Sequence, residues 1–275
     1  MVFTKGDKLT VFDGAIGTEV QKRVPESSET ITDLLNLSHP EIIRTIHSNY
    51  LAAGAQFLTT NTFSSNDIRL SRSGHADKTK ELNERGVQLA REAVENTDRE
   101  RGEFYVAGSI GPTGETLVPI GDFTFEDIFE TFTNQAEALK SGGTDWLILE
   151  TMESLREAKA ALLAAKETEL PVISSMSYGE RGRTSHGVVP AAGAVTLDFL
   201  GADVLGMNCG SGPRHYPDYI KEYSEYTLKP LLAEANAGSP ELKDGKAIYN
   251  LGPEEYLEQI KPAIPYLSGM GSCCG

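Results

Sequence analysis

Short apolar runs rich in β-branched and aromatic residues alternate with amphipathic stretches of helical period along the whole chain. Continuous apolar runs flanked by helices are typical of parallel strands that are buried on both faces. Eight such runs predict a (β/α)8 barrel, an α/β fold in which parallel strands close into a ring inside a ring of helices. The predicted strands span residues 10–13, 56–60, 104–109, 145–150, 171–177, 203–208, 230–234 and 266–270.

Seven helices are expected between these strands, over residues 40–53, 77–96, 125–141, 154–167, 191–200, 217–226 and 253–261. The rival fold is an open doubly wound sheet, which normally carries a GxGxxG turn after its first strand. Residues 13–18 read Asp-Gly-Ala-Ile-Gly-Thr and lack that spacing, so the barrel is favoured. The sequence stops at Gly275, directly after the eighth strand, and we expect a single barrel domain, residues 1–275, without its last helix. Either the chain is a trimmed or detached module of a longer polypeptide, or a partner or the N-terminal segment covers the seam.

The chain is strongly acidic, with a formal net charge of −15 at pH 7 and a sequence pI near 4.8. Such a surface repels phosphate backbones, so nucleic-acid binding is disfavoured. The N-terminal residues lack the apolar core of a signal peptide, and no apolar run approaches the length of a membrane span. Together with unpaired cysteines, these features predict a cytoplasmic protein with neither a membrane nor a nucleic acid as partner.

The chain has three cysteines, and all of them follow apolar runs: Cys209 after the sixth strand, Cys273 and Cys274 after the eighth. A free cysteine is often only a small buried hydrophobe, and a disulfide between two of the three would leave one thiol over. In a barrel, however, active sites form at the C-terminal ends of the strands, and strands six and eight are separated by one neighbour. The three thiols can therefore converge at the barrel mouth. Three thiolates with one open position are the ligand set of a catalytic zinc site.

The motifs at the strand ends resemble those of the homocysteine S-methyltransferase family, most closely the homocysteine-binding barrel of cobalamin-dependent methionine synthases. The resemblance runs from residue 10 to the end of the chain, with the motifs in order and one at nearly every strand end. There are two departures: Ser272 stands where the family usually has glycine, and the Thr-Thr-Pro helix start after the final glycine is missing. The matching stretches are 12–19 (FDGAIGTE), 59–63 (TTNTF), 110–115 (IGPTGE), 149–152 (LETM), 206–209 (GMNC), 236–238 (NAG) and 273–275 (CCG).

The resemblance implies a zinc-dependent methyl transfer to the thiol of homocysteine that gives methionine, and hence a role in methionine biosynthesis. Cys209, Cys273 and Cys274 are implied as the zinc ligands, and Asn236 as the group that can take the fourth position when substrate is absent. The alternative role of Asn236 is to form the turn before Gly238. A free thiol has a pKa of about 8.5, so it is mostly protonated at neutral pH, and coordination to Zn²⁺ removes that proton. None of the five histidines has a partner at metal-ligand spacing, and we interpret all five as surface or hydrogen-bonding residues.

Two carboxylates at strand ends are candidates for binding the substrate ammonium, because carboxylates form charge-assisted hydrogen bonds. Glu150 closes the run Trp-Leu-Ile-Leu, where an acidic residue without a partner would be costly to bury. Asp13 could instead be an ordinary turn residue before Gly14. The resemblance implies that Glu150 binds the amino group and that Asp13, Gly14 and Thr60 help to hold the polar end of the substrate.

The methyl donor is not evident, because 275 residues leave no room for a corrinoid or folate module. The resemblance leaves three donors: methylcobalamin on another protein or module, S-methylmethionine, or betaine. A quaternary ammonium donor would need an aromatic cage, and the single tryptophan, Trp146, lies inside the fourth predicted strand. Methylcobalamin presented by a corrinoid protein or module is therefore favoured. Two other classes compete: a thiolate zinc-binding barrel without turnover, and a barrel enzyme with a phosphate loop at 108–114, a segment without Lys or Arg.

Overall fold

Eight parallel strands form one sheet in the computed structural model, which describes residues 3, 9–24, 31–98, 102–243 and 246–275. The order of the strands in the sheet is β1-β10-β7-β6-β5-β4-β3-β2. The strands are β1 (Thr10–Val11), β2 (Phe57–Thr59), β3 (Tyr105–Ile110), β4 (Trp146–Met152), β5 (Val172–Met176), β6 (Val204–Cys209), β7 (Leu231–Ala235) and β10 (Gly269–Ser272).

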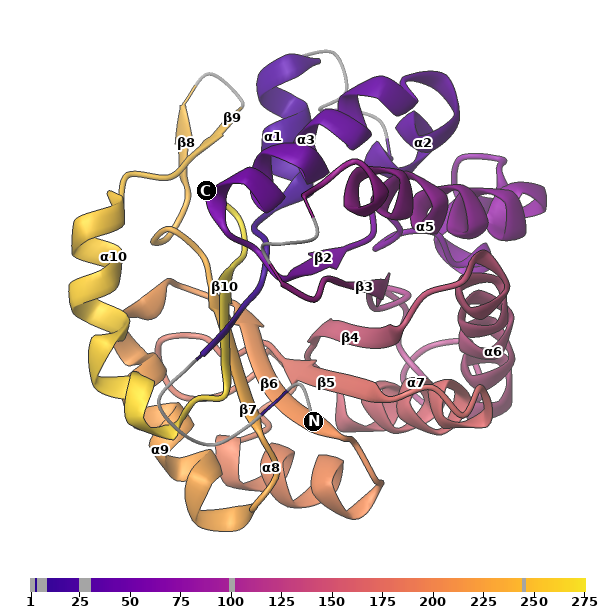
Figure 1. Ribbon diagram of the computed structural model, residues 1–275. Helices are drawn as coiled ribbons and strands as arrows, with labels where there is room; N and C mark the ends of the chain where they lie inside the picture. The colour runs from indigo at the N-terminus through magenta and orange to yellow at the C-terminus, as the bar shows by residue number, and fades with distance from the viewer. Residues whose placement is uncertain (1–2, 4–8, 25–30, 99–101, 244–245) are drawn as a thin grey trace.

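The first and last strands of this order meet, so the sheet closes into a barrel. A parallel bridge joins Phe12 to Phe57, and the N–H of Asp13 donates to the carbonyl of Phe57 at 3.0 Å. The view along the barrel in Figure 1 shows the strands inside a ring of helices. The predicted (β/α)8 barrel is confirmed.

Large apolar side chains fill one end of the barrel interior. The buried cluster contains Phe12, Phe57 and Trp146 together with Phe3, which packs edge-on against Trp146 at 5.3 Å between ring centroids. The eighth strand contributes Gly269 at this level, and a Cβ there would come within 3.2 Å of the Phe3 ring. The amino-terminal end of the barrel is therefore plugged by side chains, which leaves the carboxyl-terminal end to hold a ligand.

Helices follow seven of the strands, and the seven predicted helices are present, with each end within two residues of the predicted position. Local signals explain several ends: α3 begins with Pro40 and stops at Gly54, whose φ is +110°, and Thr124 and Asp127 form a capping box on α6. The seven are α3 (Pro40–Ala53), α5 (Thr79–Glu95), α6 (Phe125–Gly142), α7 (Leu155–Glu167), α8 (Pro190–Phe199), α9 (Tyr216–Tyr226) and α10 (Pro253–Ile260).

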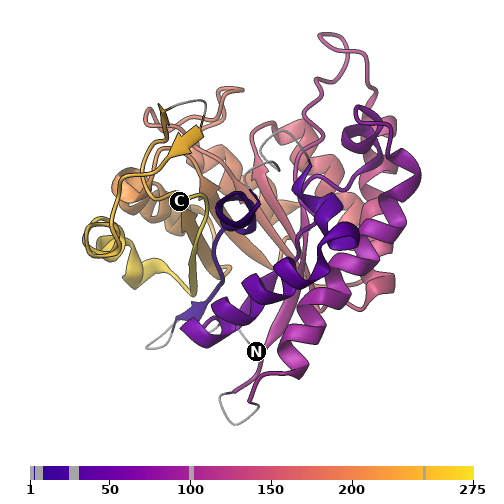
Figure 2. The same cartoon turned by 90° about the horizontal axis from the view of Figure 1, so that it is seen from above.

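Several short elements were not predicted from the sequence. Two of them, α1 (Ile16–Arg23) and α2 (Leu35–Ser38), lie between β1 and α3, and α4 (Asp67–Ser71) follows β2. A hairpin of β8 (Glu241–Lys243) and β9 (Lys246–Ile248) follows β7, and Figure 2 places it on the same side of the barrel as the end of the chain. Short 3-10 turns make up the rest: η2 (Thr32–Leu34), η3 (Ala76–Lys78), η5 (Pro213–His215) and η6 (Lys261–Tyr266).

Two predictions are corrected by the structure. The eighth strand was expected over 266–270, but Tyr266 ends the 3-10 turn η6 and the strand begins at Gly269. The second correction concerns His47, which was expected on the surface or in a hydrogen bond. His47 is fully buried on the inner face of α3, and neither ring nitrogen has a hydrogen-bond partner among the described residues.

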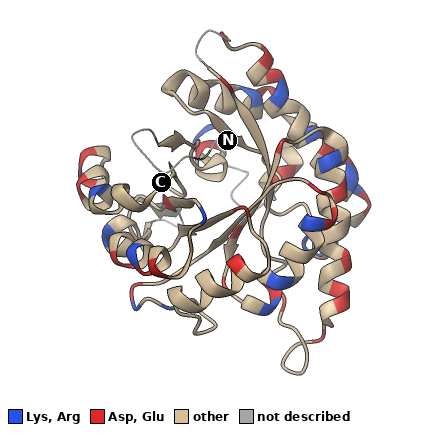
Figure 3. Cartoon of the chain, turned by 60° about the horizontal axis from the view of Figure 1, so that its bottom comes forward, with Lys and Arg blue, Asp and Glu red and all other residues tan. Residues whose placement is uncertain are grey.

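Charged residues are concentrated on the outer helices, where Figure 3 shows acidic and basic segments side by side. Gly275 lies three residues beyond β10, so no helix follows that strand within the described chain. Of the described helices, none combines the length and the hydropathy that crossing a membrane requires.

Candidate active site

A cavity of about 340 Å³ opens at the carboxyl ends of the strands. Its lining combines apolar side chains such as Ile16, Phe63 and Ile148 with carboxylates, hydroxyls and thiols. Of the eight predicted site residues, seven line this cavity: Asp13, Gly14, Thr60, Glu150, Cys209, Cys273 and Cys274. The barrel therefore brings together residues from five strand ends that are up to 261 positions apart (13 to 274) in the sequence.

The three cysteines meet because β7 alone separates β6 from β10. All three are free thiols, and their sulfur atoms hydrogen-bond to one another. Hydrogen bonds from Cys209 and Cys273 hold the pKa of Cys274 well below its usual range. Cys209 has a φ of +65°, an uncommon backbone conformation for a residue with a side chain.

Asn236, the eighth predicted residue, lies beside the cysteines outside the cavity lining. Its Nδ2 donates to the carbonyl of Gly210 at 2.7 Å and lies 3.6 Å from Cys209 Sγ, while its Oδ1 accepts from the N–H of Cys274 at 3.0 Å. This side chain therefore ties the end of β6 to the end of the chain.

The donor set of this cluster fits zinc in its chemistry, because thiolates are soft ligands that Zn²⁺ takes in proteins and the three thiols lie in one cavity. Among the described residues, no three His, Cys, Asp or Glu side chains already stand in the geometry of a metal site.

Three carboxylates face the cavity, and the sequence pointed to two of them. Both oxygens of Asp13 accept bonds from Thr59, one from its N–H at 2.8 Å and one from its Oγ1 at 2.8 Å. Burial raises the pKa of Asp13 to about 8. Glu150 accepts from Ser109 Oγ at 2.5 Å and from Asn208 Nδ2 at 3.3 Å, and burial raises its pKa to about 7.

The third carboxylate, Glu234, was missed, although it closes an apolar run in the same way as Glu150. Burial raises the pKa of Glu234 well above the usual range, and the nearby Glu150 and Asp13 add to the shift. Among the described residues that line the cavity there is no Lys or Arg. The cavity therefore favours a ligand that carries a positive charge.

Ser109 and Asn208 are further cavity residues that sequence reasoning did not assign. The N–H of Ser109 donates to Thr60 Oγ1 at 2.9 Å, so Ser109 connects Thr60 to Glu150. Asn208 donates to Thr151 Oγ1 at 2.8 Å and accepts from the N–H of Thr151 at 2.7 Å, which holds that residue at a φ of +60°. Both residues end a predicted strand, and this position could have identified them as candidate site residues.

Gly14 is required by close packing. A Cβ at this position would lie 2.8 Å from Ser272 Oγ and 2.9 Å from the hydroxyl of Tyr50. The glycine lets the turn after β1 approach β10 at the edge of the cavity.

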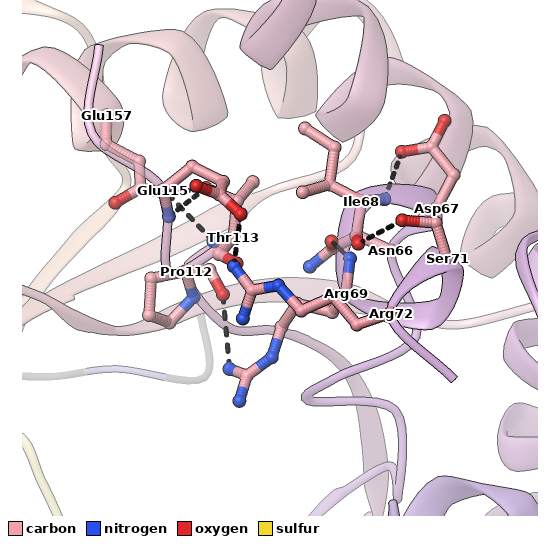
Figure 4. Close-up of polar contacts among 10 residues, drawn as sticks. All are labelled: Asn66, Asp67, Ile68, Arg69, Ser71, Arg72, Pro112, Thr113, Glu115 and Glu157. Atoms are coloured by element: carbon pink, nitrogen blue, oxygen red, sulfur yellow. Dashed lines mark hydrogen bonds and ion pairs between the residues drawn. The ribbon is translucent and has the colours of Figure 1, made fainter. Parts of the chain in front are cut away.

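The rim of the cavity beside β3 is held by a charged cluster (Figure 4). From α4, Arg69 donates to the carbonyl of Pro112 at 3.2 Å, and Arg72 pairs with Glu115 at 2.5 Å. Glu157 of α7 accepts from the N–H of Thr113 at 2.8 Å and from its hydroxyl at 2.6 Å. The Gly-rich segment after β3 is therefore fixed from two sides.

Phe63 forms the wall between this rim and the cavity. The guanidinium of Arg69 lies 5.4 Å from the centre of the Phe63 ring. Gly111 packs against the edge of the same ring and against the carbonyl oxygen of Phe63. A Cβ at Gly111 would come within 2.5 Å of the Phe63 ring. The glycine of the IGPTGE motif thus makes room for an aromatic wall of the cavity.

Comparison with known proteins gives one family for nearly the whole chain. A family model described as "Homocysteine S-methyltransferase" matches residues 10–275. The chain is 30% identical to the methionine synthase of Mycobacterium leprae over 285 aligned residues and 31% identical to that of Mycobacterium tuberculosis over 281, matches that include 99% and 98% of the chain. It spans about a quarter of the length of these relatives, 24% in each case.

Solved structures show the same fold. The metallated form of the homocysteine methyltransferase MmuM from Escherichia coli superposes with a TM-score of 0.81 at 23% identity, covering 98% of this chain and 92% of that one. The apo form of the same protein gives a TM-score of 0.74.

Proposed function

Because the chain belongs to the homocysteine S-methyltransferase family, we propose that it transfers a methyl group to the thiol of homocysteine and gives methionine. The observation that carries this proposal is the meeting of Cys209, Cys273 and Cys274 with an acidic pocket in one cavity. A thiol-binding metal site beside carboxylates is what a substrate with a thiol at one end and an ammonium at the other requires. We propose that residues 1–275 act as one homocysteine-binding barrel and that the protein is cytoplasmic.

We propose Cys209, Cys273 and Cys274 as the ligands of a zinc ion, with Asn236 available at the fourth position when substrate is absent. When bound, zinc supplies a Lewis acid that lowers the pKa of the substrate thiol, and its thiolate ligands leave the sulfur electron-rich. Asn236 is placed for this role, because its Nδ2 contacts Cys209 Sγ and its Oδ1 accepts from the N–H of Cys274.

The other residues bind the amino acid part of the substrate. Glu150 lines the same cavity as the thiols and is oriented by Ser109 and Asn208, so it can accept a hydrogen bond from the ammonium. Asp13 is fixed by Thr59 at the neighbouring strand end. Thr60 and Gly14 complete the polar end of the cavity, and Phe63 and Ile148 contact the carbon chain.

We propose a methylcorrinoid, presented by another protein or module, as the methyl donor. The similarity to methionine synthases supports this choice, and so does the fact that the cavity lining contains one aromatic side chain, Phe63, among the described residues. A cage for a quaternary ammonium group normally needs more than one aromatic ring.

The test supplies zinc-loaded protein and L-homocysteine with one donor at a time: methylcobalamin, S-methylmethionine or betaine. We expect methionine, with cob(I)alamin visible by absorbance, in the methylcobalamin reaction. Methionine from either of the other donors alone would overturn the corrinoid assignment and leave homocysteine methylation standing. No methionine from any donor, with zinc bound, would favour a zinc-binding barrel without turnover.

A further inference from the structure

Glu234 is a cavity carboxylate to which the proposed reaction gives no role. Its side chain lies at the carboxyl end of β7 and is 6% exposed. Asp13 and Glu150 each accept two hydrogen bonds from neighbouring side chains or backbone, whereas no described residue donates one to Glu234. Because Glu234 lines the cavity and accepts no hydrogen bond from the described residues, its carboxylate is available to accept one from a ligand in the cavity.

The barrel register places Glu234 between the two other carboxylates. On one side it pairs with Asn208 of β6, whose side chain donates to Glu150. On the other side it pairs with Gly271 of β10, and the next residue donates its N–H to the carbonyl of Asp13. The three carboxylates are close enough to interact electrostatically in every pair.

Gly271 leaves the space that the Glu234 carboxylate uses. A Cβ on Gly271 would lie 3.1 Å from Glu234 Oε1 and 2.8 Å from the carbonyl oxygen of Asp13. A larger residue at this position would collide with the turn after β1 and would press against the Glu234 carboxylate.

An α-ammonium group has three N–H donors, like the ammonium of lysine, and carries the charge that this cavity lacks. We propose that Glu234 accepts the third hydrogen bond from the ammonium of homocysteine, beside Asp13 and Glu150. Glu234 is then a substrate-binding residue that selects thiols bearing an amino group over thiols without one. This inference rests on the proposed function, because it takes homocysteine as the ligand.

The experiment compares two ligands that differ only in the amino group, L-homocysteine and 4-mercaptobutanoate. Each is titrated by calorimetry into zinc-loaded wild-type protein, Glu234→Gln and Glu157→Gln, without a methyl donor. Glu157 is a matched control, since it is also a buried glutamate (5% exposed) but holds Thr113 at the rim, outside the cavity lining. Zinc content and thermal unfolding show that each variant is folded and loaded. Glu234→Asp, which keeps the charge, replaces Glu234→Gln if that variant does not fold.

We expect Glu234→Gln to bind L-homocysteine about 10- to 100-fold more weakly than wild type, the range for a hydrogen bond to a charged group. Its affinity for 4-mercaptobutanoate should stay within about twofold of wild type, because that ligand has no ammonium to lose; Glu157→Gln should leave both affinities near wild type. Where Glu234→Asp is used instead, it should weaken homocysteine binding by less than about tenfold, because the charge is kept, and should leave the affinity for 4-mercaptobutanoate near wild type. The inference would be overturned if Glu234→Gln bound homocysteine as tightly as wild type, or if it lost affinity equally for both ligands. In either case, homocysteine binding by the wild-type protein would still support the proposed function. Wild-type protein that binds neither ligand would contradict the proposed function itself and the inference with it.

Discussion

Replacing His47 with leucine should make the protein less sensitive to acid. His47 is fully buried on α3 and neither ring nitrogen has a partner among the described residues, so burial lowers its pKa from 6.5 to about 4. Its charged form is therefore strongly disfavoured in the folded protein. In the unfolded chain the same imidazole takes up a proton below about pH 6.5.

The sign and the size of the effect follow from this difference in pKa. The pKa of His47 is lower in the folded protein than in the unfolded chain, so protonation of His47 favours unfolding. The free energy of unfolding is therefore almost unaffected by His47 above pH 6.5 and falls as the pH is lowered to about 4. Two-state linkage with these values gives a loss of about 2 kcal/mol at pH 5 and only about 0.2 kcal/mol at pH 7. Wild-type protein should therefore lose about 2 kcal/mol more than His47→Leu between pH 7 and pH 5.

Urea denaturation of both proteins at pH 7 and pH 5, in the presence of a zinc chelator, measures this difference. Other titrating groups are common to both proteins and cancel in the comparison. His39→Leu, at an exposed histidine next to the start of α3, is the matched control. Wild-type and His47→Leu proteins that lose equal stability between the two pH values would refute the reasoning.

Two further predictions concern the cavity. Glu150→Gln should weaken L-homocysteine binding by about 1.5–3 kcal/mol, the range for hydrogen bonds to charged groups, with zinc content unchanged; wild-type affinity by calorimetry would assign the ammonium to other residues. Gly111→Ala should lower the free energy of unfolding by about 1–3 kcal/mol and weaken homocysteine binding, because the added methyl would lie 2.5 Å from the Phe63 ring. An unchanged unfolding transition in Gly111→Ala would show that Phe63 can move aside without cost.

The barrel could be predicted from the sequence because its strands are buried on both faces. Each strand therefore reads as a continuous apolar run, and the helices between them are long enough to show an apolar stripe. The strands β8 and β9 have three residues each and α4 has five, which is too short for a hydrophobic period to be recognised. The helix α1 has only two buried residues, Ile16 and Val20, so its stripe is weak.

Part of the candidate site could be predicted from the sequence because the active-site residues of barrel enzymes lie at the carboxyl ends of the strands. That rule identified Asp13, Glu150 and the cysteines. Applied to the end of the seventh strand as well, it would also have identified Glu234. His47 was misjudged although it falls at the helical spacing of the buried residues Ile43 and Leu51. The hydrogen bonds made by residues such as Ser109 depend on which atoms of neighbouring strands face each other, and the sequence of one strand does not contain that information.

Zinc content is the most direct test of the account, because the proposed methyl transfer depends on a metal held by the three cysteines. Purified protein is reconstituted with zinc, dialysed and analysed for metal, beside Cys209→Ala, Cys273→Ala, Cys274→Ala and the control Ser272→Ala. We predict one zinc per chain in the wild type and in Ser272→Ala, whose side chain lines the cavity next to Cys273 without being a proposed ligand. Each cysteine variant should lose the bound zinc. A full complement of zinc in any one of the three cysteine variants, or none in the wild type, would contradict the account.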